Sequence, residues 1–466
     1  MVNNEELTIS RLASLIHRRK LSPLELTNFL LDRIQRLQPF INAYITVTAE
    51  IAIAQAKKAE KEIVKGQYRG ALHGIPISLK DLFYTAGVRT TAGSQILKRF
   101  IPKENAVVVD RLLESGCILL GKTNLHEFAY GATNVNPHYG SVHNPWSLAH
   151  IAGGSSGGSA ASVVSAQAIA SLGTDTGGSI RIPAAACGCV GLKPTYGRVS
   201  LKGVIPLADS LDHAGPLTRC VMDAVLLFEA MAGPDPWAPY SRKTATSSIR
   251  RGLKGLKIGI PKQYFFGRLQ PDVRQAVSAA PNVFEQLGAD ICEVNIKGME
   301  ATSWLAADIT AGEALAYHTD WLERKREKYG EDLRSRLTQS MNMLAKTYIQ
   351  AQIKRAEYSE RMEQALHSVH LLLTPALPVT APRLDQKFVR IGNDREDVRS
   401  VLLSLTRPAN LSGLPAVSMP CGFSWQGLPI GLQLIGRRHD ELTVLRAAYA
   451  YESVTSWHKR FPPDPA

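Results

Sequence analysis

One glycine-rich segment, residues 153–181, restricts most strongly what this chain can fold into. It contains Ser155 within GGSSGG and Ser179 within DTGGS, separated by an apolar run over 160–172 that we expect to be helical. Glycine lacks a Cβ, so backbone N–H groups can turn toward one point and a substrate can approach closely. An acyl-transfer site needs such donors beside a hydroxyl nucleophile. A flexible Gly/Ser linker would not enclose a strongly apolar run, so the segment predicts a site.

The composition is that of a globular protein with a sizeable core, since 45% of the 466 residues are hydrophobic and 20% are charged. The net charge of +13 comes from scattered basic residues, so we interpret it as a source of solubility and expect no direct contact with nucleic acid. Six cysteines are too few for a disulfide framework, and the pair Cys187 and Cys189 lacks the further ligands of a metal site. Neither a metal nor a cofactor is expected.

The first residues and the apolar runs of the chain predict where in the cell the protein is found. The first ten residues lack the basic and apolar regions of a secretory signal. No apolar run reaches the length of a transmembrane helix. We therefore expect a soluble cytoplasmic protein without a membrane partner, and a homodimer stays open.

Helical and strand-like segments alternate along most of the chain, which predicts an α/β architecture. Ser22 opens a capping box that marks the start of an early helix. Residues 183–200 are expected to form a loop of small residues, and residues 300–368 to be almost entirely helical. The Pro-rich and then basic segment at 237–256 is the best candidate for an excursion or a subdomain boundary.

A predicted strand over residues 74–81, GIPISLKD, carries Lys80 at the end of an apolar segment. A buried lysine is rare unless it is paired or functional. A lysine at a sheet edge can instead extend its amine to water. This segment alone leaves both interpretations open.

Two motif matches point to other chemistries. Residues 116–123 fit the phosphate-binding pattern GxxxxGK[ST] and place Lys122 in it. That loop needs exposed backbone amides that wrap around phosphates, whereas the four intervening residues here are apolar and strand-like. The HEF sequence at 126–128 lacks the second histidine of a zinc helix. We expect neither a nucleotide site nor a zinc site.

Several longer segments resemble the hallmark segments of the amidase signature family. They are GIPISLKD, GGSSGGSAA, GTDTGGSIRIPAAACGCVGLKPTYGRVS, SLDHAGPLTR, GKTNLHEFAYG, NLSGLPAVSMP and GLPIGLQLIG. The resemblance implies an α/β fold with a large mixed central β-sheet covered by helices on both faces. It also implies a single domain over 1–466, with a core of about 70–232 plus 370–455 and a more variable helical region at 237–368.

The resemblance further implies a catalytic triad in which Ser179 is the acylated nucleophile, Ser155 a bridging serine after a cis peptide, and Lys80 the base. The implied oxyanion hole consists of the backbone N–H groups of Thr176, Gly177, Gly178 and Ser179. Serine is a poor nucleophile until a base removes its proton. Lysine can be that base only if its pKa falls far below about 10.4, which burial can achieve.

The substrate pocket is expected to contain Tyr130, Gly131, Ile205 and Leu207, which suggests an apolar or aromatic substrate group. For Asp175 and Arg181 we expect structural roles in the glycine turn. Arg336 could bind a carboxylate, but an arginine in a charged helix usually lies on a solvated face, and we expect this.

Two functions from this family stay open. One is a free-standing hydrolase of small-molecule amides, including aryl amides and carbamates. The other is the glutamine-splitting A subunit of a glutamyl-tRNA(Gln)/aspartyl-tRNA(Asn) amidotransferase. The chain departs from the pattern of that enzyme at 316–320, AYHTD, where a RYDG-type element is expected. It also has Leu403 where an aspartate would hold the ammonium group of glutamine. A buried ammonium needs a polar or charged partner, so we favour the free-standing hydrolase.

Overall fold

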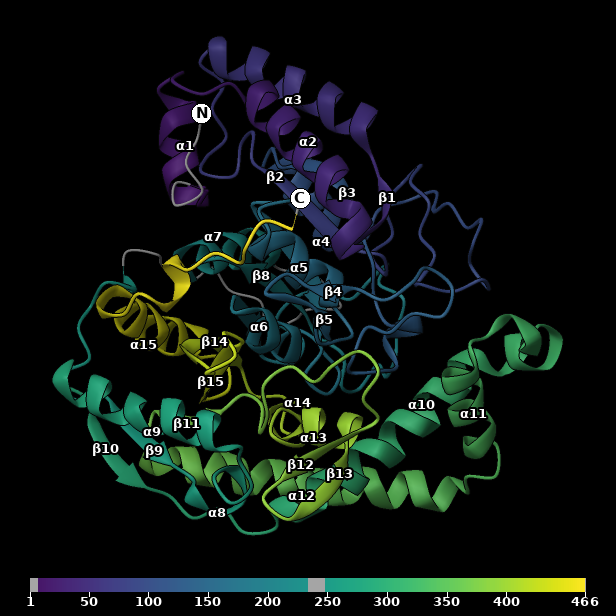
Figure 1. Ribbon diagram of the computed structural model, residues 1–466, viewed down its shortest axis with the longest axis vertical. Helices are drawn as coiled ribbons and strands as arrows, with labels where there is room; N and C mark the ends of the chain where they lie inside the picture. Colours follow the sequence, from purple (N-terminus) through teal and green to yellow (C-terminus); the bar gives the residue numbers. More distant parts are fainter. Residues whose placement is uncertain (1–6, 234–247, 466) are drawn as a thin grey trace.

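The computed structural model describes residues 7–233 and 248–465, so part of the predicted boundary segment at 237–256 lies outside the described residues. A mixed sheet of eleven strands runs through the molecule in the order β1-β3-β2-β6-β8-β7-β14-β15-β11-β9-β10 (Figure 1). The strands are β1 (Tyr44–Val47), β2 (Pro76–Lys80), β3 (Ile118–Thr123), β6 (Ala170–Thr174), β7 (Val190–Lys193), β8 (Ala214–Thr218), β9 (Lys257–Ile260), β10 (Asp290–Glu293), β11 (Leu371–Pro375), β14 (Ala416–Phe423) and β15 (Pro429–Gly436). Two small hairpins lie outside it, β4 (His143–Asn144) with β5 (Ser147–Ile151) and β12 (Phe388–Ile391) with β13 (Asp394–Asp397).

Helices cover both faces of this sheet, as expected. Successive strand residues point to opposite faces. On β15, a Cβ at Gly431 would meet Ala185 of α6, whereas a Cβ at Gly436 would meet Val444 of α15. The helices are α1 (Ile9–His17), α2 (Pro23–Ile41), α3 (Ala49–Val64), α4 (Val107–Glu114), α5 (Gly157–Val164), α6 (Arg181–Cys187), α7 (Val221–Met231), α8 (Lys262–Phe265), α9 (Pro271–Gln286), α10 (Thr302–Arg324), α11 (Glu331–Ser340), α12 (Ala345–Ser368), α13 (Val398–Ser404), α14 (Arg407–Leu411) and α15 (Glu441–Val454).

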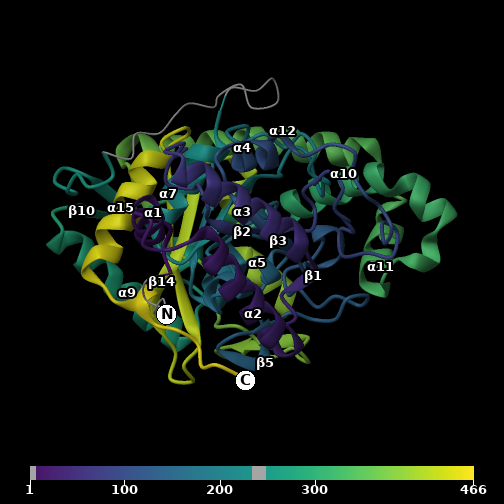
Figure 2. The same ribbon diagram turned by 90° about the horizontal axis from the view of Figure 1, so that it is seen from above.

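The helical region is as long as the sequence predicts. Helices α10, α11 and α12 follow one another over the expected range 300–368. Figures 1 and 2 both place α10 and α11 at one extremity of the molecule and β10 at the other. The capping box at Ser22 is confirmed, because its side chain accepts from the N–H groups of Leu24 and Glu25 at the start of α2. Among the described residues, no helix has both the length and the apolar character that crossing a membrane requires.

The sheet register brings together two distant parts of the sequence. Strand β2 pairs in parallel with β6, and Leu79 lies opposite Leu172. The carboxyl ends of neighbouring parallel strands meet at the same edge of a sheet, where α/β proteins commonly bind ligands. Lys80 therefore ends β2 next to Thr174, at the point where β6 leads into the glycine turn 175–179.

Two local predictions are wrong. The apolar run 160–172 is not one helix, because α5 ends at Val164 and β6 begins at Ala170, with Ala166 at a φ of 54° in the turn between them. The segment 183–200 is not simply a loop, because it contains most of α6 and all of β7. The alanines of α6 favour a helix, and Pro183 lies in its first turn, where no N–H is needed.

Lys122 does not form a phosphate-binding loop. It lies within β3 and is 0% exposed. Its amine donates to the carbonyl of Phe83 at 2.5 Å and to Thr90 Oγ1 at 2.8 Å, and it lies 3.5 Å from Asp81 Oδ1. The amine is fully used inside the protein, which confirms that the motif match is accidental.

The close packing of α5 against the sheet gives a stability prediction. A Cβ at Gly158 would lie 2.5 Å from the carbonyl oxygen of Ala43 and closer still to that of Asn124. Backbone atoms cannot yield as a flexible side chain can, so Gly158→Ala is expected to destabilise the protein by about 3 kcal/mol or more. Thermal unfolding measures the loss. Gly252→Ala is the control, because nothing lies within 4 Å of its Cβ position, and an equal effect of both variants would contradict the prediction.

Candidate active site

Lys80 lies buried at the carboxyl edge of the sheet. The residue is 0% exposed, and its Nζ donates hydrogen bonds of 2.8 Å to Ser155 Oγ and 2.8 Å to Thr174 Oγ1. Burial lowers the pKa of Lys80 to about 7, although the charges of Asp212 and Asp175 act in the opposite direction. Both partners of the amine are hydroxyl groups, so an uncharged Lys80 can accept a proton from Ser155.

Ser155 precedes α5 in a tightly packed segment. The peptide bond between Gly154 and Ser155 is cis. A Cβ at Gly154 would lie 2.7 Å from the backbone nitrogen of Asn134, so only glycine fits. The carbonyl of Ser155 accepts from the N–H of His126 at 3.1 Å. Glycine thus allows the backbone to approach closely, and the surrounding hydrogen bonds fix the serine beside Lys80.

The turn at 176–179 presents backbone donors that no protein group uses. Within the described residues, none of the N–H groups of Thr176, Gly177, Gly178 and Ser179 donates a hydrogen bond. Gly178 has a φ of 137°, and a Cβ there would collide with Thr406 Oγ1. Ser179 ends the turn and is 4% exposed. These are the features of an oxyanion hole beside a hydroxyl group.

A buried ion pair holds this turn. Arg181 donates from Nε to Asp175 Oδ2 at 3.0 Å and from Nη2 to Asp175 Oδ1 at 3.0 Å. It also donates to Gln433 Oε1 at 2.7 Å, to Asn410 Oδ1 at 2.6 Å and to the carbonyl of Thr406 at 2.8 Å. Burial alone would raise the pKa of Asp175, but Arg181 holds it well below its usual range. The geometry therefore supports structural roles for Asp175 and Arg181.

Asp212 joins the turn to the neighbouring loop. Its Oδ1 accepts from Thr176 Oγ1 at 2.5 Å, and its Oδ2 accepts from the N–H of Leu207 at 2.8 Å and of Ala208 at 3.2 Å. Burial raises the pKa of Asp212 to about 7 despite these hydrogen bonds. A second group besides Lys80 therefore titrates near neutral pH at this site.

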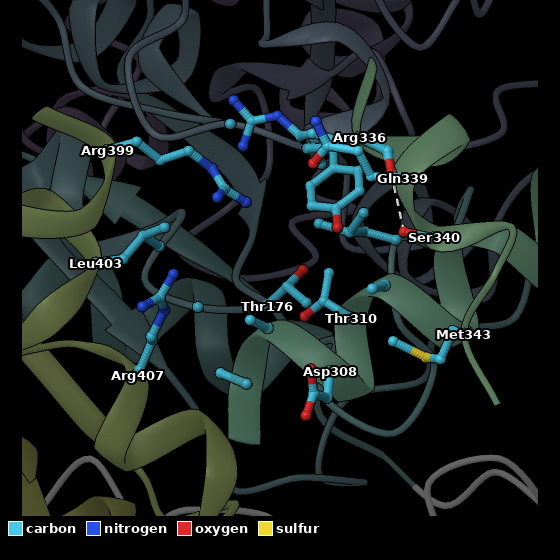
Figure 3. A pocket seen from close by; sticks show the side chains of 18 of the residues that line it. Thr176, Asp308, Thr310, Arg336, Gln339, Ser340, Met343, Arg399, Leu403 and Arg407 are labelled. Carbon is cyan, nitrogen blue, oxygen red and sulfur yellow. Dashed lines mark hydrogen bonds between the residues drawn. The ribbon is translucent and has the colours of Figure 1, made fainter. Parts of the chain in front are cut away.

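A cavity of about 570 Å³ opens beside the turn (Figure 3). Thr176, Gly177 and Ser179 line it, whereas Gly178 does not. Of the predicted pocket residues, Tyr130, Gly131 and Leu207 also line it. Ile205 does not, since it is buried and its N–H donates to the carbonyl of Leu82. The remaining lining residues come mainly from α10, α11, α13 and α14: Ala129, Ala306, Ala307, Asp308, Thr310, Ala311, Arg336, Gln339, Ser340, Asn342, Met343, Leu344, Thr347, Arg399, Leu403 and Arg407.

The sequence profile of the amidase family matches residues 25–445. The chain belongs to the amidase signature family. It is 41% identical to the A subunit of the glutamyl-tRNA(Gln) amidotransferase of Geobacter sp. strain M21, over 98% of this chain and 99% of that protein. A solved amidase structure has 36% identity and a TM-score of 0.89, covering 96% of this chain and 99% of that one. A structure from a vestigial complex, described as revealing the origins of an s-triazine catabolic enzyme, has 34% identity and a TM-score of 0.91, covering 96% and 98%.

The amidase cavity contains charges that the sequence analysis missed or placed elsewhere. Arg336 lines the cavity, and it also pairs with the exposed Asp332 on the same helix, so it lies on a charged helix face that borders the cavity. Arg399 and Arg407 line it too and were not predicted. One signal was available: both arginines interrupt the otherwise apolar segment around Leu403. Sequence spacing alone could not show that α13 and α14 face the glycine turn.

Two other polar groups of the amidase have structural partners. Glu127, from the HEF sequence, accepts from Ser94 Oγ at 2.6 Å and from the N–H of Gly330 at 2.9 Å, and it pairs with His138. His318, within the segment AYHTD, is buried beside Tyr329, and burial lowers its pKa to about 3. In the part of the chain that the structure describes, no cluster of three metal-ligating side chains occurs.

The buried pair of Asp175 and Arg181 gives a stability prediction. Asp175→Asn leaves the guanidinium of Arg181 buried without its counter-ion, which typically costs about 3–5 kcal/mol. The denaturant midpoint is therefore expected to fall markedly. Asp385→Asn is the control, because Asp385 pairs with Arg383 on the surface and its side chain is 74% exposed. That variant is expected to change stability by less than about 1 kcal/mol. Similar losses in both variants would refute a central role for the buried pair.

Proposed function

We propose that this amidase hydrolyses the C–N bond of a small-molecule amide through an acyl-enzyme on Ser179. The observation that carries the proposal is the set of unused N–H groups at 176–179, which lie beside the cavity that Ser179 lines. In the proposed reaction, Ser179 Oγ attacks the carbonyl carbon and its proton passes through Ser155 to Lys80. The proton then goes to the leaving nitrogen, and water hydrolyses the acyl-enzyme.

Burial of Lys80 supports its role as the base. A general base works best when its pKa lies near the working pH, and burial lowers that of Lys80 to about 7. At neutral pH a substantial fraction of the amine is therefore uncharged. Its hydrogen bond to Ser155 provides the first link of the proton path.

The unused donors support stabilisation of the tetrahedral intermediate. The oxygen of the attacked carbonyl becomes negatively charged, and fixed backbone N–H groups need no reorganisation to meet it. The buried pair of Asp175 and Arg181 fixes the turn before any substrate binds. We propose Thr176, Gly177, Gly178 and Ser179 as the donors.

The substrate distinguishes two candidates. The names of the curated relatives favour the second one, a glutamine-hydrolysing A subunit of an amidotransferase, over the free-standing hydrolase. The cavity favours the free-standing hydrolase, because Leu403 lines it next to Gly177 and offers no charge to the ammonium group of glutamine. We propose amide hydrolysis as the activity of the site in both cases.

An activity assay on the purified protein distinguishes the two candidate functions. It is offered aryl amides, carbamates and glutamine, first alone and then with the other subunits of an amidotransferase. Turnover of a small amide by the chain alone supports the free-standing hydrolase. Glutamine hydrolysis that appears only with the added subunits supports the amidotransferase.

Ser179→Ala tests the nucleophile. The variant is expected to lose the mass increase of one acyl group that a slowly hydrolysed substrate leaves on the wild-type protein. Turnover should fall by about 10⁴-fold or more, as when other serine nucleophiles are removed. Intact-protein mass spectrometry after acid quenching measures the free protein and the acylated protein. Ser453→Ala, an exposed serine of α15, is the control. A persistent acyl adduct on Ser179→Ala would exclude this assignment.

The pH dependence tests the base. Below pH about 7, Lys80 gains a proton and can no longer accept one from Ser155, so kcat/KM should fall as the pH falls and reach a plateau above it. Asp212 also titrates near pH 7. In Asp212→Asn the acidic limb should persist and move to lower pH, because a negative charge that raises the pKa of Lys80 is removed. Loss of the limb in Asp212→Asn would assign it to Asp212 instead.

A further inference from the structure

We infer that the amide hydrolysed at this site carries a carboxylate, which an arginine cluster formed by Arg336, Arg399 and Arg407 binds. The inference rests on the proposed function and names its substrate class. Three helices supply the cluster: α11 contributes Arg336, α13 contributes Arg399 and α14 contributes Arg407. All three residues line the cavity that also contains Ser179.

The three side chains converge from different directions. Figure 3 shows Arg399 and Arg407 extending into the cavity from one side and Arg336 entering from the opposite side. The guanidinium carbons of Arg336 and Arg399 lie 5.7 Å and 5.5 Å from the centre of the Tyr130 ring. The Tyr130 ring thus contacts two of the three cations at the cavity wall.

Protein carboxylates neutralise the cluster only in part. Arg336 forms an ion pair with Asp332, an exposed acid on the same helix. Arg407 is 7% exposed, and its Nη1 donates to Ser303 Oγ at 3.0 Å, which is an uncharged partner. Arg399 has no hydrogen-bond partner or ion pair among the described residues, and its Nε is buried. Arg399 and Arg407 therefore form no ion pair within the part of the chain that the structure describes.

Electrostatics agree with this charge balance. Burial lowers the pKa of Arg399 to about 10, and the charges of Arg336 and Arg407 lower it further, while Tyr130 and Asp332 act in the opposite direction. Burial also lowers the pKa of Arg407, and Asp397 partly opposes this. With a pKa of about 10, the guanidinium of Arg399 stays charged at neutral pH. A buried cation without a partner is unfavourable, and a bound carboxylate would supply charge-assisted hydrogen bonds to it.

The apolar neighbour of the cluster and its own charges also disfavour an ammonium group close to that carboxylate. Leu403 lies between Arg399 and Arg407 in the sequence and lines the cavity. An α-ammonium, as in glutamine, would meet cations and an apolar side chain there. Asp308, an acid that lines the same cavity from α10, is outnumbered there by the three arginines. The preferred substrate is therefore a monoamide of a dicarboxylic acid without an α-amino group.

Binding to the Ser179→Ala protein tests the inference without turnover. Calorimetry compares oxamate, malonamate, succinamate and glutaramate with glutamine and with neutral pentanamide. The tightest monoamide is expected to bind about tenfold or more tightly than glutamine and pentanamide, since hydrogen bonds to charged groups are the stronger ones. Added salt should weaken the binding of the monoamide and not that of pentanamide. Equal affinities, tighter binding of glutamine, or no binding of any monoamide would overturn the inference.

Single substitutions test the arginines. Arg399→Gln and Arg407→Gln should each lower the affinity for the tightest monoamide about tenfold or more. Arg334→Gln, on α11 but outside the cavity lining, is the control and should leave it unchanged. If the arginines only support the fold, the variants should instead lower the unfolding temperature. If Arg399 instead binds substrate, Arg399→Gln should not lower the unfolding temperature, because the substitution removes a buried cation that the charges of Arg336 and Arg407 repel.

A separate measurement keeps the two proposals distinct. A fluorophosphonate labels an activated serine whatever the natural substrate is. Labelling of Ser179 in the wild-type protein, together with equal binding of charged and neutral amides, would overturn the inference and leave the proposed function standing. Selective binding of monoamides without labelling of Ser179 would support the anion site and reject the proposed nucleophile.

Discussion

The buried ion pair between Asp175 and Arg181 is the interaction on which the rest of the site depends. It connects the turn after β6 to α14 through Asn410 and to β15 through Gln433. The turn therefore keeps its four N–H groups directed away from the protein's own acceptors. A charged pair buried this deeply costs desolvation energy, and its many hydrogen bonds offset that cost. The structure uses it to hold a backbone shape that apolar packing alone would not specify.

Sheet topology places the proposed base. Lys80 ends β2, and the glycine turn follows β6, its parallel neighbour. This register removes the lysine amine from water, and burial lowers its pKa to about 7. The register also gives the amine a hydroxyl partner in Ser155. The contrast with Lys122 is instructive, because that buried lysine lies close to Asp81 and donates to a carbonyl. Burial lowers the pKa of Lys122 as well, to about 8, so the two buried lysines of one sheet differ mainly in their partners.

The substrate of this chain cannot be inferred from overall similarity to its relatives, because the cavity wall decides specificity. Full-length identity of about 40% indicates a shared fold and shared membership of the amidase family, whereas function depends on the residues of the site. Specificity depends on the cavity wall, where α11, α13 and α14 bring three arginines and Leu403 near Ser179. Sequence identity over the whole chain hardly changes when a few such cavity residues are replaced. A change at one or two of them can alter the substrate while the turn, the sheet and the lysine stay the same.

Sequence alone determined the α/β class, the capping box at Ser22 and the segments that carry Lys80, Ser155 and Ser179, because these depend on local patterns and on family motifs. It failed at residues 160–172, where an apolar run is compatible with both a helix and a strand, and only packing decides between them. Tertiary structure alone decided the burial of Lys80, the exclusion of Ile205 from the cavity and the convergence of Arg336, Arg399 and Arg407. These properties depend on which distant segments meet, and the sequence does not encode that in any local spacing.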